Sequence, residues 1–402
     1  MTIFEKSKRW VVTIFGELKH LLKVNIREYG MYIALAAIII TFAITTDGLF
    51  ISSRNISTLL NQTGYIMVLA VGMTLIIVNK HIDLSVGFLA GFLGAIAAIF
   101  MTKFGMSEWI VIPIVMVFGL IIGLLNGFMV GQLGIPAYVV SLAGMFIFRG
   151  LLLMATQRTG TIIVPNKGFN AIGNGFIPDI DNSSDMHMLT LILGGVAILF
   201  FIFNEIKGRR NKMKYKFEVL STPIFVGKLL FISLIIGYIC WILAGYNGFS
   251  WTVIICIIVV TIYSFITQKT ALGRHIYAVG GNGDAAQLAG ISVKKITYVV
   301  FGSMSMLAAL SGVLFTSRLQ SATTTAGTLF ELDAIASAFV GGASANGGAG
   351  KITGSVIGAL VMASLTNGMN LMGVDISFQY AIRGAVLVLA VLFDVTTRKK
   401  RN

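Results

Sequence analysis

Charged residues are scarce in this chain. Asp, Glu, Lys and Arg together occupy 11% of its 402 positions, against roughly 25% in a soluble domain. Hydrophobic residues make up 56%, and only five prolines stand beside 45 glycines. The two cysteines, Cys240 and Cys256, lie in apolar segments and are expected to be inert packing residues, so neither a disulfide nor a metal site is supported. The composition excludes a soluble domain and indicates an integral membrane protein.

Catalytic motifs are also missing. None of the four histidines stands in a metal-ligand spacing with cysteines or carboxylates, and neither a nucleophile elbow nor an HExxH pattern occurs. The string GAGKIT around Lys351 imitates a phosphate-binding loop but has Ala345 in place of the first glycine and Ile352 in place of Ser or Thr. The chain is therefore not expected to be an enzyme, and any ATP hydrolysis must occur in another subunit.

Acidic residues are few, and their positions bear on the energy source. All sixteen fall in termini, loops or the edges of apolar runs, and Asp83, Glu331 and Asp333 come nearest to a membrane interior. An ion-coupled carrier usually needs a carboxylate inside the membrane. The sequence therefore favours an external energy source, although sodium coordination by backbone carbonyls stays open.

Long apolar runs are abundant, and each is long enough to span or nearly span a bilayer. They predict an all-α protein with about 10–12 transmembrane helices, because isolated helices satisfy their own backbone in lipid. The runs fall at about 29–46, 57–78, 84–102, 109–133, 137–156, 188–204, 224–245, 248–267, 296–316, 331–346, 352–371 and 378–394.

Basic residues cluster between these runs and set the expected orientation. The net charge of +14 is concentrated in an amino-terminal arm at 1–28, loops at about 205–223 and 268–295, and a tail at 395–402. Twelve runs place all four clusters on one side, so we expect them, and both termini, in the cytoplasm. Residues 29–394 would form one polytopic domain, with the acidic 157–187 loop outside. The basic residues thus indicate contact with membrane lipid and not with nucleic acid.

Glycines interrupt two of the apolar regions. Gly354 and Gly358 stand one helical turn apart, as do Gly87 and Gly91, so each pair is expected to let a neighbouring segment approach closely. The recurrence favours two pseudo-repeated halves with a transport path at their interface. Chance recurrence of small residues in glycine-rich membrane helices is the alternative.

The 268–295 loop is rich in alanine and glycine. Asp284 is expected to cap a short helix that Gly290 ends. Such a helix can enter a groove on a partner, although a plain solvated loop is the simpler interpretation. The residues concerned are Gly283, Asp284, Ala285, Ala286, Gln287, Leu288, Ala289 and Gly290.

Four ordered motifs resemble the membrane permeases of monosaccharide ABC importers, of the ribose, xylose and arabinose type: HIDLSVG at 81–87, GLLNGFMVGQLGIPAYVVSLAGMFIFRG at 123–150, LGRHIYAVGGNGDAAQLAGI at 272–291 and ELDAIASAFVGGASANGGAGKITGS at 331–355. The extra 205–247 region is more similar to the xylose or multiple-sugar branch. The resemblance implies a bacterial cell-membrane homodimer with an extracytoplasmic sugar-binding protein. It also implies two cytoplasmic ATP-binding subunits that hold ATP and Mg, coupled through the 283–290 helix. Related permeases carry nucleosides or other small polar solutes, and an ion-coupled secondary carrier is the rival from another class.

Amides within the runs are candidates for lining the path of the sugar, because they exchange hydrogen bonds with hydroxyls without holding them as charges would. Packing between helices is an equal alternative for each of them. Arg149 is a further candidate for the path: it is expected to face a wet cavity or to mark a broken span near Gly150, and a structural pairing is an equal alternative. Lys228 and Arg383 are expected to lie at span edges or to snorkel. The candidate amides are Asn61, Gln62, Asn126, Asn367 and Asn370.

Overall fold

The computed structural model describes residues 26–156, 160–180 and 186–399. Most of the predicted 1–28 arm and the last three residues of the 395–402 tail lie outside the described residues. The order of elements is α2 (Ile26–Thr45), the short 3₁₀ helix η1 (Leu49–Ile51), α3 (Ser53–Val78), α4 (Val86–Lys103), α5 (Glu108–Gly131), α6 (Ala137–Thr156), β1 (Thr161–Ile163), α7 (Lys167–Asn174), α8 (Met188–Lys214), α9 (Thr222–Ala244), α10 (Trp251–Lys269), α11 (Ala271–Gly281), α12 (Gly283–Leu288), α13 (Val293–Leu319), β2 (Ser321–Thr323), α14 (Phe330–Val340), α15 (Ile352–Leu371) and α16 (Ile376–Lys399).

The chain divides into two compact units. Unit 1 comprises 1–30, 51–57 and 176–249, and unit 2 comprises 31–50, 58–175 and 250–402. In unit 1, α8 and α9 form a helical hairpin in which the Lys228 ammonium lies 2.9 Å from the Glu205 carboxylate. Lys228 thus forms an ion pair within the hairpin while 40% of its side chain stays exposed, and its location at a span edge stays a prediction. At the other end of α8, the Asp179 carboxylate accepts hydrogen bonds from the first backbone N–H groups of the helix.

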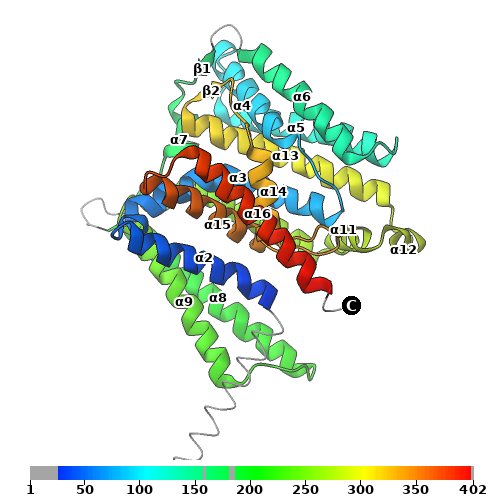
Figure 1. The fold of residues 1–402 in the computed structure, drawn as a ribbon. Coiled ribbons are helices and arrows are strands. Elements are labelled where there is room, and N and C mark those ends of the chain that lie inside the picture. The colour runs from blue at the N-terminus through cyan, green and yellow to red at the C-terminus, as the bar shows by residue number, and fades with distance from the viewer. Residues whose placement is uncertain (1–25, 157–159, 181–185, 400–402) are drawn as a thin grey trace, which may run out of the picture. The chain divides into compact units, whose positions relative to one another are not determined.

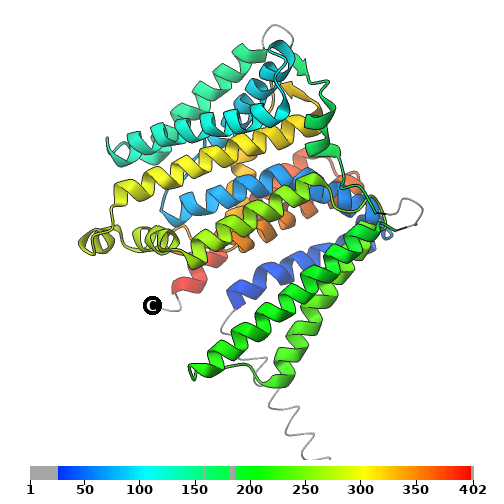
Figure 2. The ribbon, with the colours of Figure 1, turned by 180° about the vertical axis from the view of Figure 1, so that it is seen from behind.

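Helix α13 occupies the middle of unit 2 (Figures 1 and 2). It packs along α5 and α4, and on another side Gly72 of α3 meets Met304. The α5 face that meets α13 carries Gly119, Gly123 and Gly127, spaced by four residues. A Cβ on Gly119 would lie 2.5 Å from the carbonyl oxygen of Ser305, so these glycines let the two backbones touch.

Ten helices among the described residues are long and apolar enough to cross a membrane, at the lower end of the predicted range. In addition, the Gly30–Thr45 part of α2 is a shorter apolar helix. The predicted continuous span at 331–346 is wrong. Helix α14 has 11 residues, about 16 Å at 1.5 Å per residue, which is too short for a hydrocarbon core of about 30 Å. Three glycines with positive φ, at 342, 347 and 348, follow it and turn the chain towards α15.

The structure also bears on the predicted repeat of two halves and on the all-α prediction. The structure does not show the predicted repetition of halves, since α3 is a continuous helix of 26 residues and α14, in the corresponding position, has only 11. The all-α prediction holds apart from one small antiparallel ribbon in which Thr161 of β1 pairs with Thr323 of β2. The ribbon joins the segments that follow α6 and α13.

Candidate functional site

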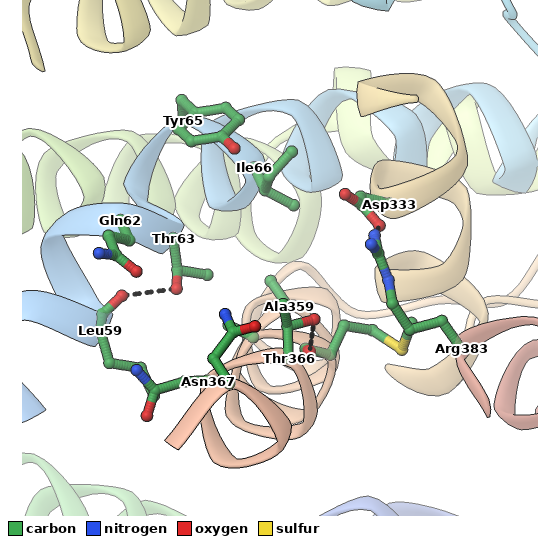
Figure 3. Close-up of a pocket in the computed structure, with 13 residues that line it drawn as sticks. Leu59, Gln62, Thr63, Tyr65, Ile66, Asp333, Ala359, Thr366, Asn367 and Arg383 are labelled. Carbon is green, nitrogen blue, oxygen red and sulfur yellow. Dashed lines mark hydrogen bonds and ion pairs between the residues drawn. The ribbon is translucent and has the colours of Figure 1, made fainter. Parts of the chain in front are cut away.

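Unit 2 contains a cavity of about 210 Å³ between α3, α14, α15 and α16 (Figure 3). Eight of its thirteen lining residues carry polar side chains, so its walls can form hydrogen bonds while the rest remains apolar. The volume lies below the roughly 300–1,000 Å³ of pockets for drug-sized ligands. The lining consists of Leu59, Gln62, Thr63, Tyr65, Ile66, Asp333, Ala359, Met362, Ala363, Thr366, Asn367, Asn370 and Arg383.

One wall of the cavity, at Tyr65, lies inside the length of a spanning helix. The Ser311 hydroxyl of α13 donates a hydrogen bond of 2.9 Å to the carbonyl oxygen of Tyr65, which fixes the level of one wall. Ser311 is eight residues from the end of α13 at Leu319 and eighteen from its start at Val293, distances of about 12 and 27 Å at 1.5 Å per residue. The wall of the cavity at Tyr65 therefore lies at this depth along the spanning helices.

An ion pair between Arg383 of α16 and Asp333 of α14 forms one side of the cavity (Figure 3). Both side chains are about four-fifths buried, with 20% and 22% of their surface exposed. Asp333 lies in the first turn of α14, where a carboxylate is favoured by the helix dipole. Arg383 therefore does not snorkel or mark a fuzzy edge, and that prediction is wrong. Sequence reasoning missed the pair because its members are fifty residues apart.

Three of the predicted amides reach the same cavity. Gln62 comes from α3, whereas Asn367 and Asn370 come from α15. Gln379 of α16 donates its side-chain N–H to Asn370 Oδ1 at 2.8 Å and to the carbonyl of Val374 at 2.9 Å, which orients the Asn370 amide. Gln379 was not among the candidates.

The other three candidates lie elsewhere. Asn61 and Asn126 are buried but are not among the residues that line the cavity, and among the described residues none bonds to Asn61 Oδ1 or Asn126 Nδ2. Arg149 is exposed on α6, with its guanidinium 5.5 Å from the centre of the Phe88 ring. Helix α6 continues through Arg149 and Gly150, so the predicted break there is wrong.

The 268–295 loop contains the second candidate element. Helix α11 is followed by α12, a six-residue helix, and Gly290 ends the turn with φ of +81°. The cap is not Asp284 as predicted: Asn282 Oδ1 accepts the hydrogen bond from the Ala285 N–H at 3.0 Å. Leu288 is 91% exposed.

The segment 341–350 connects this element with the cavity helices. The Tyr277 hydroxyl of α11 donates to the Gly350 carbonyl at 2.6 Å, and Lys80 donates to the Gly281 carbonyl at 3.1 Å. The Gly348 N–H donates to the carbonyl of Val78, the last residue of α3, at 2.8 Å. Burial raises the pKa of Tyr277, so this hydroxyl keeps its proton and remains a donor. Three hydrogen bonds thus hold α11, α3 and the 341–350 segment together.

The family model described as branched-chain amino acid transport system / permease component matches residues 55–391. The chain belongs to this permease family. Over 379 aligned residues it is 39% identical to the xylose transport system permease protein of Haemophilus influenzae, which covers 94% of this chain and 98% of the relative. The corresponding Escherichia coli K12 protein is 36% identical over 96% of each chain, and the E. coli K12 ribose import permease is 30% identical over 95% and 98%. No solved structure matches.

These matches confirm the resemblance seen in the four sequence motifs, and they extend it to nearly the whole chain. In this permease, the four predicted packing glycines lie at close backbone contacts. A Cβ on Gly354 or Gly358 would overlap the carbonyl oxygen of Gly341 or Ser337, respectively. On α4, a Cβ on Gly91 would lie 2.5 Å from the carbonyl oxygen of Ala326, and one on Gly87 would overlap Glu331 and the Gly327 carbonyl.

Buried carboxylates correct one premise of the sequence reasoning. Asp83 is completely buried, Glu331 is 6% exposed and Asp394 is 5% exposed, although all three were assigned to loops, edges or the tail side of a run. Asp83 Oδ1 accepts hydrogen bonds from the Ser85 N–H and hydroxyl at 2.9 and 2.6 Å. Burial raises the pKa of Asp83, and this effect outweighs the two hydrogen bonds from Ser85, which lower it. The permease therefore does bury acidic groups, and their supposed absence is no argument about its energy source.

Proposed function

We propose that the chain is the transmembrane subunit of an ATP-driven importer that passes a monosaccharide, a pentose such as xylose, across the bacterial cell membrane. The near full-length similarity to xylose transport permeases carries this proposal. The ribose permeases align over a similar length at lower identity, which supports a pentose over other solutes. The 210 Å³ polar cavity supports a small hydrophilic cargo.

The proposed assembly contains two copies of this chain, two ATP-binding subunits that hold ATP and Mg²⁺, and an extracytoplasmic sugar-binding protein. The basic clusters support a cytoplasmic location for the ATP-binding subunits, both termini and α12. ATP drives transport by binding one of two states of the assembly better than the other. The permease itself then needs only weak contacts with the sugar, since conduction requires release.

Helix α12 is the proposed docking element for the ATP-binding subunit. Its Leu288 is the most exposed large apolar side chain of this region, and its base is held by the Asn282 cap and the Gly290 turn. The hydrogen bonds from Tyr277 and Lys80 would pass a displacement of α11 and α12 to the 341–350 segment. That segment leads into α15, which contributes six of the residues that line the cavity, among them the polar Thr366, Asn367 and Asn370.

The test is uptake of labelled xylose by cells that produce the complete transporter, with Leu288→Ser as the variant. We expect normal amounts of folded permease in the membrane, loss of the co-purifying ATP-binding subunit and a loss of uptake of about tenfold or more, because a central apolar anchor contributes roughly 2 kcal/mol to an interface. Leu133→Ser is the matched control, since Leu133 is 58% exposed in the turn after α5. Normal uptake by Leu288→Ser would remove the docking role of α12.

An ion-coupled carrier is the second candidate, favoured by the buried carboxylates Asp83 and Glu331. Membrane vesicles that contain this chain alone would then take up sugar, and an ionophore would abolish the uptake. The importer predicts no uptake without the ATP-binding subunits and no effect of the ionophore in their presence. Competition by nucleosides in the complete transporter decides the remaining alternative cargo.

A further inference from the structure

The Asp333–Arg383 pair has more hydrogen-bonding capacity than its two members use on each other. A guanidinium carries five N–H donors, and one carboxylate engages at most two of them. A carboxylate offers about four acceptor positions, of which the arginine fills at most two. Both residues line the cavity, so the remaining donors and acceptors lie where a bound molecule can reach them.

A purely structural role is a weak explanation for this pair. Ion pairs removed from water contribute little net stability, because the loss of hydration offsets the attraction between the charges. Here the pair forms the wall of a cavity instead of being enclosed by packing, and each member keeps about a fifth of its surface exposed. Charges at this depth are usually retained in membrane proteins for function.

The surroundings match the two kinds of surface that a sugar presents. Amide groups of Asn367 and Gln62 supply both donors and acceptors for hydroxyls, as Figure 3 shows on α15 and α3. Leu59, Ile66 and Met362 supply apolar walls for the C–H faces of a ring. The opposite charges of the pair cancel, so the cavity gives an uncharged solute polar contacts without attracting free ions.

We propose that Asp333 and Arg383 form the hydroxyl-binding centre of a site for an uncharged monosaccharide within the membrane, and that their mutual neutralisation excludes acidic sugars. This inference rests on the proposed function. Asp333 accepts a hydrogen bond from one hydroxyl, and Arg383 donates to a neighbouring hydroxyl oxygen. A sugar acid would bring a third charge to a balanced pair. A zwitterionic amino acid would lose the hydration of two charges, and the pair has no uncompensated charge to offset that loss.

The experiment measures protection of a cavity cysteine in the complete transporter, without ATP. Thr366→Cys places a thiol on the α15 wall, while the native Cys240 and Cys256 are both buried and label slowly. The rate of maleimide labelling is measured with D-xylose, with D-xylonate and with leucine. We expect xylose to slow labelling several-fold at millimolar concentrations, and xylonate and leucine to have no effect. Leu371→Cys, on an exposed position of the same helix, is the control and should show no protection.

Substitutions of the pair then assign the effect. In Asp333→Asn/Arg383→Gln, both charges disappear together, and we expect xylose protection to fall at least several-fold with unchanged labelling in the absence of sugar. Asp333→Asn alone leaves a cation in the cavity, and we expect it to gain protection by xylonate. Should the double variant misfold, Asp333→Arg/Arg383→Asp keeps the ion pair but exchanges donor and acceptor, and it should accumulate normally while losing protection.

Three results would overturn the site: no protection by xylose in the Thr366→Cys background, equal protection in the double variant, or stronger protection by leucine than by xylose. These outcomes are separate from the proposed function, because the labelling needs no ATP-driven step. ATP-dependent uptake without protection would refute the site alone. Protection in a chain whose uptake is independent of the ATP-binding subunits would refute the importer and leave the site standing.

Discussion

The contact between α14 and α15 allows a quantitative prediction for Gly358→Ala. A Cβ at this position would overlap the carbonyl oxygen of Ser337 and lie 2.8 Å from the amide nitrogen of Gly341. Both neighbours are backbone atoms, so no side-chain rotation relieves the overlap and the helices must separate. Overpacking of this kind costs about 1–3 kcal/mol, and we place this case at about 3 because backbone must move. The helix propensity of alanine over glycine returns about 1 kcal/mol, which leaves a net loss of about 2.

Gly150→Ala is the matched control. Gly150 is also inside a membrane helix, α6, but a Cβ there would meet nothing within 4 Å. This variant gains the helix propensity of about 1 kcal/mol without the overlap. Thermal unfolding of the detergent-purified chain, followed by its tryptophan fluorescence, should therefore show opposite shifts for the two variants. If Gly358→Ala unfolds at or above the temperature of Gly150→Ala, the close-approach reasoning is wrong.

Three further predictions concern caps and connecting hydrogen bonds. Asn282→Ala should lower uptake far more than Asp284→Ala, because loss of an N-cap costs about 1 kcal/mol and Asn282 holds that position; similar uptake by the two variants would count against the cap. Tyr277→Phe should accumulate normally yet uncouple ATP hydrolysis from uptake, since it removes only the hydrogen bond to the Gly350 carbonyl; an unchanged ratio of sugar to ATP would contradict the connection. Desolvation raises the pKa of the Asp179 carboxyl, but hydrogen bonds from backbone N–H groups outweigh it, so the pKa in the folded protein is lowered. The ionised carboxylate therefore contributes its full stability above the unfolded pKa of about 4. This contribution is lost as the pH falls through the lowered pKa of the folded state. Acid unfolding of wild type and Asp179→Asn should show this loss only in wild type.

Hydropathy and small-residue spacing predicted much of this fold, because both are local properties. Apolar length placed the ten spanning helices, and the spacing of Gly354 and Gly358 pointed to a close contact without naming the partner segment. Hydropathy also predicted a full span over 331–346, because the apolar run continues across Gly341 and Gly342, where helix α14 in fact ends. A helix end set by positive φ has no strong signal in hydropathy.

The residues that sequence reasoning missed depend on distant contacts. Arg383 and Asp333 each resembled a charge at the edge of a span, and only the packing of α16 beside α14 makes them a pair. Asp83 was assigned to a loop or span edge, yet its side chain is completely buried, although Lys80 and Ile82 in the same loop are exposed. Asn282 and Asp284 are both good capping residues. Which of them caps α12 is decided by backbone angles, and Asn282 has the extended conformation that a cap requires.

Helices α14 and α15 touch through backbone atoms, at Gly341 with Gly354 and at Ser337 with Gly358. Side chains in ordinary helix contacts can change rotamer and so absorb small displacements of one helix against the other. At these two points no side chain separates the backbones. A shift of the 341–350 segment must therefore move α14 and α15 together, and the opposite end of α14 carries Asp333. A displacement at the glycine end is then passed to the Asp333 carboxylate with no side chain between the two helices to absorb it at these points.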